Sequence, residues 1–143
     1  MTDNYFLDTN LFVYTFDRDA PEKQVRANAL IKEALEERTG CISYQVIQEF
    51  MNVATRKFET PLSTSDCEKY LYTVLAPLCS VFTSIALYGL ALEIMDRWRL
   101  SYYDALIVAA ALQAECGILY SEDLQDGLKI QYLTIRNPFI ERR

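Results

Sequence analysis

Short apolar runs alternate along the chain with longer segments of helical periodicity. The apolar runs predict five strands, at positions 5–7, 41–43, 80–82, 118–120 and 132–135. The periodic segments predict helices at 11–16, 21–37, 45–58, 64–75, 85–98 and 102–114. Strands separated by helices are typical of an α/β domain, so we expect a mostly parallel five-stranded sheet with helices on both faces.

Proline and glycine residues mark several of these boundaries. Pro21 suits the first turn of a helix, whereas Pro77 is expected to stop the helix before it. Gly40 and Gly117 are expected to end the helices that precede them. The helix at 102–114 is apolar on nearly every face, which is typical of a buried helix. The length of 143 residues favours a single domain spanning 1–143.

Composition indicates the class of protein and the compartment to expect. The chain is 51% hydrophobic and 24% charged, which is typical of a globular fold. Its four cysteines lie far apart in sequence, and without histidine a zinc site would need all four of them. We therefore expect free thiols in a reducing cytoplasm. The polar first four residues predict no signal peptide, and the apolar run 105–112 is too short to span a membrane.

Four carboxylates stand directly after predicted strands or inside apolar helical stripes, namely Asp8, Glu49, Asp104 and Asp123. Such charges are costly unless a cation compensates them, and neither a basic residue nor a histidine belongs to the set. Oxygen ligands alone favour a hard divalent cation. Because ligands bind beyond the carboxyl ends of parallel strands, we expect the four acids to converge at one edge of the sheet.

Each acid also has a structural interpretation, which the sequence leaves open. Asp8 is a candidate turn residue, and Glu49 a candidate exposed helix charge. Asp104 follows Ser101 at the spacing of a capping box, and Asp123 is suited to cap a short helix.

The net charge of −6 argues against nucleic-acid binding by general electrostatics, but it is compatible with a nuclease whose acids are neutralised by cations.

At these acids the sequence resembles the PIN-domain ribonucleases, and in particular the VapC-type toxins of toxin–antitoxin pairs. The resemblance runs through the whole chain in four motifs, which are Phe6-Leu7-Asp8-Thr9-Asn10, Gln48-Glu49-Phe50, Tyr103-Asp104-Ala105-Leu106-Ile107 and Tyr120-Ser121-Glu122-Asp123-Leu124. It implies a three-layer α/β/α fold, and a metal-dependent endoribonuclease that binds one or two Mg²⁺ or Mn²⁺ ions. The products would carry 5′-phosphate and 3′-hydroxyl ends.

The resemblance also implies roles for individual residues. Asp8, Glu49, Asp104 and Asp123 would form the catalytic, metal-binding quartet, with Glu122 as a competitor for the fourth place. Support is expected from the small polar residues beside them, namely Thr9, Asn10 and Ser121. The implied partners are an RNA substrate, tRNA and mRNA being candidates, a second copy in a homodimer, and a cognate antitoxin; no membrane is implied.

Positive residues that could steer RNA are few, namely Arg56, Lys57, Arg97, Arg99 and Arg136. Ordinary surface charge near helix ends explains them equally well. Three other functions remain as alternatives. One is a PIN-domain nuclease of RNA maturation without an antitoxin, and another is a non-catalytic PIN-like binding module. The third, a haloacid-dehalogenase-like phosphatase, would need an aspartate where Asn10 stands.

Overall fold

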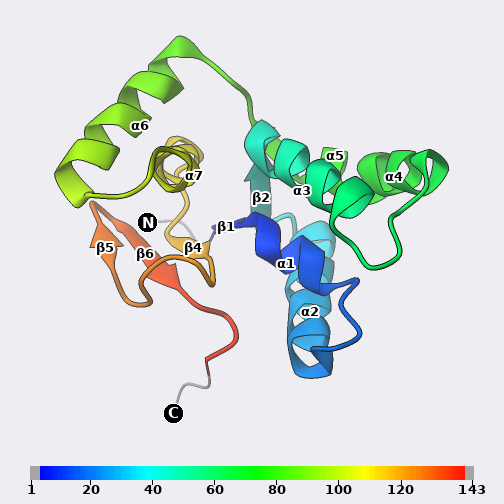
Figure 1. Cartoon of the computed structure of the whole chain (residues 1–143). Coiled ribbons are helices and arrows are strands. Elements are labelled where there is room, and N and C mark those ends of the chain that lie inside the picture. The colour runs from blue at the N-terminus through cyan, green and yellow to red at the C-terminus, as the bar shows by residue number, and fades with distance from the viewer. Residues whose placement is uncertain (1–3, 141–143) are drawn as a thin grey trace.

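A six-stranded sheet lies at the centre of the fold, with the strand order β3-β2-β1-β4-β6-β5 (Figure 1). The structure is a computed structural model that describes residues 4–140. The strands are β1 (Tyr5–Leu7), β2 (Gly40–Ser43), β3 (Cys79–Val81), β4 (Ile118–Tyr120), β5 (Lys129–Ile130) and β6 (Leu133–Arg136). All pair in parallel except β5, which is antiparallel to β6. The predicted mostly parallel α/β sheet is therefore confirmed, and the five predicted strands form its parallel part.

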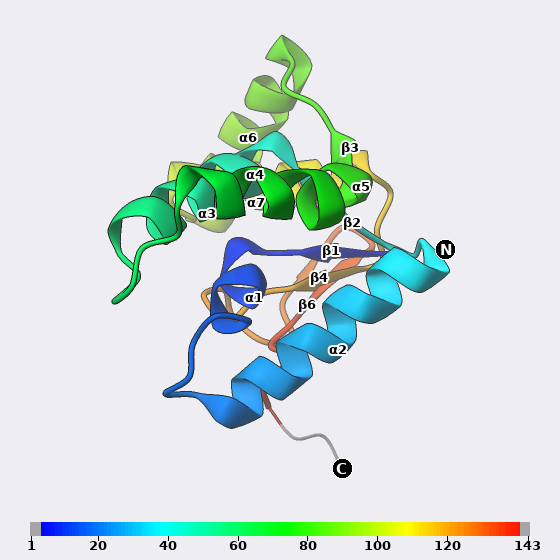
Figure 2. The ribbon, with the colours of Figure 1, turned by 90° about the vertical axis from the view of Figure 1, so that its right-hand side faces the viewer.

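Helices cover both faces of this sheet. They are α1 (Thr9–Tyr14), α2 (Pro21–Glu37), α3 (Tyr44–Arg56), α4 (Thr64–Tyr70), the π-helical turn η1 (Leu71–Leu75), α5 (Ala76–Leu78), α6 (Ile85–Trp98) and α7 (Tyr102–Gln113). Figure 2 shows β1, β4 and β6 between α2 on one side and α3 to α7 on the other. Residues 105–112 of α7 are all buried, as the apolar pattern of this helix predicts.

Three boundary predictions are wrong. Pro77 does not stop the helix before it, because η1 widens the backbone ahead of α5, with Ala76 N–H bonded to the Leu71 carbonyl. A proline lacks the N–H and crowds the carbonyl four residues earlier, so the wider turn accommodates it. Gly40 and Gly117 are not the residues that end α2 and α7 in the left-handed backbone conformation. Arg38 and Glu115 adopt that conformation, each with φ of 58°.

Gly40 instead has a packing role at the start of β2. A Cβ atom there would lie 2.4 Å from the Ala34 Cβ and 2.8 Å from a Tyr5 ring carbon. The close approach of α2 to β2 thus requires glycine at this position.

The short strand β5 has no counterpart among the predicted strands. Its two residues carry too little apolar pattern to be found, and a turn with left-handed Gln131 returns the chain to β6. Residues 1–3, which enter the expectation of no signal peptide, lie outside the described residues. Between residues 4 and 140, no helix is both long and apolar enough to cross a membrane.

The carboxyl ends of three strands are fastened together by backbone hydrogen bonds. Asp8 N–H donates to the Tyr120 carbonyl at 3.0 Å, which joins the end of β1 to β4. Ser121 N–H donates to the Arg136 carbonyl at 3.0 Å, which joins the end of β4 to β6. The residues that follow β1 and β4 therefore lie side by side, although more than a hundred positions separate them.

Candidate active site

Asp8 lies at the junction of β1 and α1, and only 6% of it is exposed. Its Oδ1 accepts a hydrogen bond from the Thr9 backbone N–H at 2.7 Å, which caps the first turn of α1. Its Oδ2 accepts a hydrogen bond from the Ser121 hydroxyl, also at 2.7 Å. The local turn role that the sequence left open is therefore real, and it fixes the direction of the carboxylate.

The charge of Asp8 is poorly compensated. Burial raises its pKa from 3.8 to about 7, against hydrogen bonds from Ser121 and Thr9 that lower it, and the charges of Asp123 and Glu49 raise it further. The two ion pairs found within residues 4–140 are Lys23–Glu122 and Lys32–Glu36, and neither includes Asp8. A buried carboxylate of this kind favours the approach of a cation from outside the chain.

Ser121 connects Asp8 to the loop after β4. It is fully buried, donates its hydroxyl proton to Asp8, and accepts a hydrogen bond from the Asp123 backbone N–H at 3.2 Å. No helix follows Asp123 in the described structure, so the helix-cap interpretation of this acid is wrong.

Asp123 is exposed as a residue, but its carboxylate is partly covered. This burial raises its pKa, against the nearby Asn10 side chain that lowers it, and the charges of Asp104 and Glu122 add to the rise. The Asn10 amide atoms are buried and make no hydrogen bond of ordinary geometry with the described residues. The Asn10 amide thus faces the site and is available to form further hydrogen bonds.

Glu49 extends from α3 and is held by two donors. The Thr9 hydroxyl donates to its Oε1 at 2.6 Å, and Gln45 Nε2 donates to its Oε2 at 3.1 Å. The same Gln45 nitrogen bonds the Tyr103 carbonyl at 3.1 Å, which ties α3 to the first turn of α7. Gln45 was not among the predicted site residues. Its sequence signal is its place one helical turn before Glu49.

Asp104 stands in the first turn of α7. Its backbone N–H donates to the Ser101 hydroxyl at 3.3 Å, so Ser101 is the helix cap and the bond does not involve the Asp104 carboxylate. The charge of Asp104 raises the pKa of Asp123, and the charges of Asp123 and Glu49 raise that of Asp8. The structure therefore places the four predicted acids close enough to interact electrostatically.

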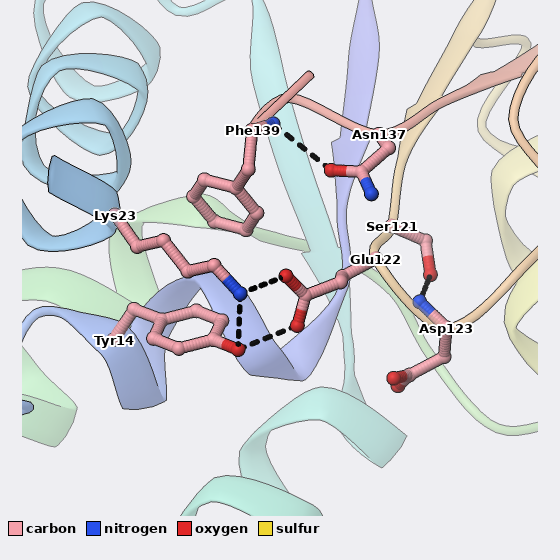
Figure 3. A network of polar contacts seen from close by, with 7 residues as sticks. All are labelled: Tyr14, Lys23, Ser121, Glu122, Asp123, Asn137 and Phe139. Carbon is pink, nitrogen blue, oxygen red and sulfur yellow. Dashed lines mark hydrogen bonds and ion pairs between the residues drawn. The ribbon is translucent and has the colours of Figure 1, made fainter. Parts of the chain in front are cut away.

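Glu122, the competitor for the fourth place, faces a different environment (Figure 3). Tyr14 donates its hydroxyl proton to Oε1, and Lys23 Nζ donates to Oε2, both at 2.5 Å. Burial acts to raise the pKa of Glu122, but the bonds from Lys23 and Tyr14 outweigh it and lower the pKa. Glu122 therefore has a cation within the chain, which makes Asp123 the better candidate for the fourth acid.

The side chains at this edge fit a hard divalent cation, since the Asp8 and Glu49 carboxylates lie beside the Ser121 and Thr9 hydroxyl groups and all of these offer oxygen ligands. Across residues 4–140, no three acidic, cysteine or histidine side chains are gathered closely enough to hold an ion together. Thr9 and Gln45 hold Glu49 in place, whereas Asp123 is exposed. Side-chain adjustment of the more exposed acids would be needed to close the set around an ion.

The predicted RNA-steering residues lie at helix ends. Arg56 and Lys57 end α3, and Arg97 and Arg99 end α6; all four are exposed. Arg97 lies with its guanidinium carbon 6.0 Å from the Trp98 ring centre. Their part in RNA binding stays a prediction. Arg136, by contrast, lies half-buried on β6, beside the joined strand ends.

Comparison with known proteins agrees with this architecture. The profile of the PIN domain family matches residues 5–125. No curated protein matches the sequence significantly. A toxin–antitoxin complex from Klebsiella pneumoniae is similar in structure, with a TM-score of 0.65 at 20% identity over 94% of this chain and 98% of that chain. The Mycobacterium tuberculosis VapC20 sarcin-ricin loop cleaving toxin gives a TM-score of 0.62 at 19% identity, over 84% and 90%.

VapBC2 from Rickettsia felis, bound to a promoter DNA fragment, gives a TM-score of 0.63 at 18% identity over 92% of this chain and 96% of that chain. At these identities the likenesses show the fold, and this fold is shared with VapC-type proteins. The family profile covers most of the sequence, including Asp8, Glu49, Asp104 and Asp123. The chain therefore belongs to the PIN domain family.

Proposed function

We propose that the chain is a Mg²⁺- or Mn²⁺-dependent endoribonuclease that hydrolyses phosphodiester bonds of RNA, as the toxin of a type II toxin–antitoxin pair. The observation that carries this proposal is the environment of Asp8, a buried carboxylate with two fixed donors and no cationic partner among residues 4–140. Membership of the PIN family supports it. So do the names of the similar structures, one a sarcin-ricin loop cleaving toxin and two others toxin–antitoxin assemblies.

The residues of the chain would bind and orient the reacting groups. Asp8 would be the central ligand of one or two ions, held by Ser121 and the Thr9 backbone. Glu49 would present its carboxylate in the direction that Thr9 and Gln45 set. Asp104 and Asp123 would complete the ligand set. When bound, the divalent cation supplies positive charge to the phosphate and makes water more acidic.

The proposal includes two protein partners. Two of the similar structures are toxin–antitoxin assemblies, which supports a cognate antitoxin for this chain. A homodimer is also proposed. Exposed aromatic side chains offer contact area for either partner, for example Tyr44 and Phe82, whose rings lie 5.1 Å apart.

Calorimetric titration with Mn²⁺ tests the metal site directly. The wild type should bind saturably, and Asp8→Asn should lose affinity by more than about 100-fold, since even residues behind metal ligands cost about 10–100-fold when mutated. Glu122→Gln is the matched control and should bind as the wild type does. Equal Mn²⁺ affinity in the wild type and Asp8→Asn would contradict the proposed site.

Cleavage is then measured on single-stranded RNA, with and without chelator. Chelator-sensitive cleavage that Asp8→Asn abolishes is the expected result. Metal binding without cleavage of any RNA tested would favour the alternative of a non-catalytic binding module.

A further inference from the structure

A cavity of about 690 Å³ lies between α2, strands β4 and β6, and the segment 137–140. Ile118 and Tyr120 line it from β4, and Arg136 from β6. Its volume is within the range of pockets that bind small molecules, about 300–1,000 Å³. None of the roles assigned above accounts for this cavity.

The cavity is cationic in a chain whose net charge is −6. Among the described residues that line it, Lys23, Arg26 and Arg136 are basic and Glu22 is acidic. Lys23 is partly neutralised by Glu122, so the two arginines supply most of the positive charge. Arg136 Nε is buried without a hydrogen-bond partner in the described structure. An unmade bond of this kind is costly, and an anionic ligand that accepted it would remove the cost.

Two aromatic rings complete the lining. Tyr120 packs edge-to-face on Tyr5 with ring centres 5.4 Å apart, and Phe139 packs in the same way on Tyr14 at 5.1 Å. These contacts fix the direction of both rings. Aromatic side chains beside arginines are typical of sites that stack an unpaired base and bind its phosphate. A duplex keeps its bases stacked inside, so a concave pocket of this size suits a single strand.

The cavity adjoins the acidic site through three short links. Tyr120 directly precedes Ser121, and the Arg136 carbonyl accepts the Ser121 backbone N–H. Lys23 bonds Glu122, which is the neighbour of Asp123 (Figure 3). The acids and the cavity are therefore neighbours at the carboxyl ends of β4 and β6.

We propose that this cavity binds one nucleotide of single-stranded RNA flanking the scissile phosphate, with Arg26 and Arg136 on its phosphate and Tyr120 or Phe139 against its base. The inference rests on the proposed function, since it names where that substrate is held. It assigns substrate positioning to residues that make no part of the acidic quartet.

The test is the fluorescence anisotropy of a labelled single-stranded RNA, measured in EDTA and again in Ca²⁺. Arg26→Gln and Arg136→Gln should each weaken binding about tenfold, the usual scale for a lost charge-assisted bond. Each should also lower the slope of log affinity against log salt by about 0.7, the value for one phosphate contact on a single strand. Lys32→Gln removes an exposed charge from the same helix and should change neither quantity.

Arg26 also donates through Nε to the Pro138 carbonyl at 3.1 Å, so its loss could disturb the segment 137–140. Arg26→Lys separates the two effects, because it keeps the charge and removes that bond. Affinity close to the wild type in Arg26→Lys supports a phosphate contact. An equal loss in Arg26→Lys and Arg26→Gln would overturn that role for Arg26.

Several outcomes would overturn the inference. The first is that the wild type binds no RNA in either buffer. The second is that both glutamine variants bind RNA with wild-type affinity. The third is that polyglutamate competes as strongly as RNA, which would indicate an acidic protein partner. If the cavity variants lose RNA binding but the wild type cleaves no RNA, the proposed function fails, and of the inference only the binding of RNA in the cavity stands. If the wild type cleaves RNA and the cavity variants keep its KM, the inference alone fails.

Discussion

Asp8 and Glu122 follow neighbouring strands at the same edge of the sheet, yet their carboxylates have opposite surroundings. Glu122 is paired with Lys23 and Tyr14, and its pKa is lowered. Asp8 is buried with neutral donors and other acids around it, and its pKa is raised to about 7. An acid that the chain compensates itself joins two elements, here α2 and the loop after β4. An acid left without a cation is where a ligand from outside can supply the charge.

The pH dependence of stability separates the two acids most strongly. The folded-state pKa of Asp8 is raised from 3.8 to about 7, so its stabilising contribution is present below pH 3.8 and is lost as pH rises through about 7. In chelator at pH 8, Asp8→Asn should therefore unfold with a free energy up to about 4 kcal/mol above that of the wild type. Urea unfolding at several pH values measures this difference, which should shrink towards pH 4.

Glu122→Gln is the control of opposite sign. A lowered pKa contributes stability above the ordinary value of 4.5, and this contribution is lost as pH falls. The stability difference between the wild type and Glu122→Gln should therefore shrink on acidification. Above pH 7, Asp8→Asn should be more stable than the wild type and Glu122→Gln less stable. Differences of the same sign would show that the contrast between the two acids is wrong.

Ser121→Ala is the next largest change. The variant removes the donor that fixes Asp8 Oδ2, so the affinity for Mn²⁺ should fall by about 10–100-fold. Calorimetry measures this loss. Ser101→Ala removes a helix cap of α7 instead and should lower stability by about 1 kcal/mol with little effect on Mn²⁺ affinity. Similar Mn²⁺ affinity in the two variants would remove Ser121 from the site.

Glu122→Gln itself should cost about 1 kcal/mol of unfolding free energy at neutral pH. The effect is modest because the Lys23 and Glu122 side chains remain 38% and 24% exposed, and solvent screens the pair. Thermal unfolding measures it, and Lys23→Gln should cost a similar amount. A loss of Mn²⁺ binding in Glu122→Gln would make Glu122 the fourth acid in place of Asp123.

Asp104→Asn should have the smallest effect on the metal-free protein. The Ser101 cap uses the backbone of Asp104, so its amide variant keeps that bond and removes one like charge near Asp123. Stability in chelator should stay within about 0.5 kcal/mol of the wild type or rise slightly, while cleavage is lost. A large loss of stability would show that the Asp104 carboxylate is structural.

Local patterns were sufficient to predict most of the fold. The helices at Pro21–Glu37 and Ile85–Trp98 and the strand at Ile118–Tyr120 lie where periodicity places them. The short strand β5 and the π-helical turn before Pro77 were missed, because two residues carry little pattern and a widened turn depends on its neighbours. The contact between Cys41 and Cys116 also has no local signal in the sequence. Their sulfurs lie 3.5 Å apart across 75 positions of sequence.

The sequence by itself determined which acids stand at strand ends and in which order, because alternation and helical period are local properties of the chain. Only the tertiary structure decided that Glu122 faces Lys23 whereas Asp123 lies beside Asn10 and Asp104. Adjacent residues point in different directions, and their partners come from distant elements. The roles proposed for Gln45 and Arg26 likewise came only from the tertiary structure, whereas Arg136 was already a candidate for steering RNA. What each contacts depends on how helices and strands pack, which no local pattern records.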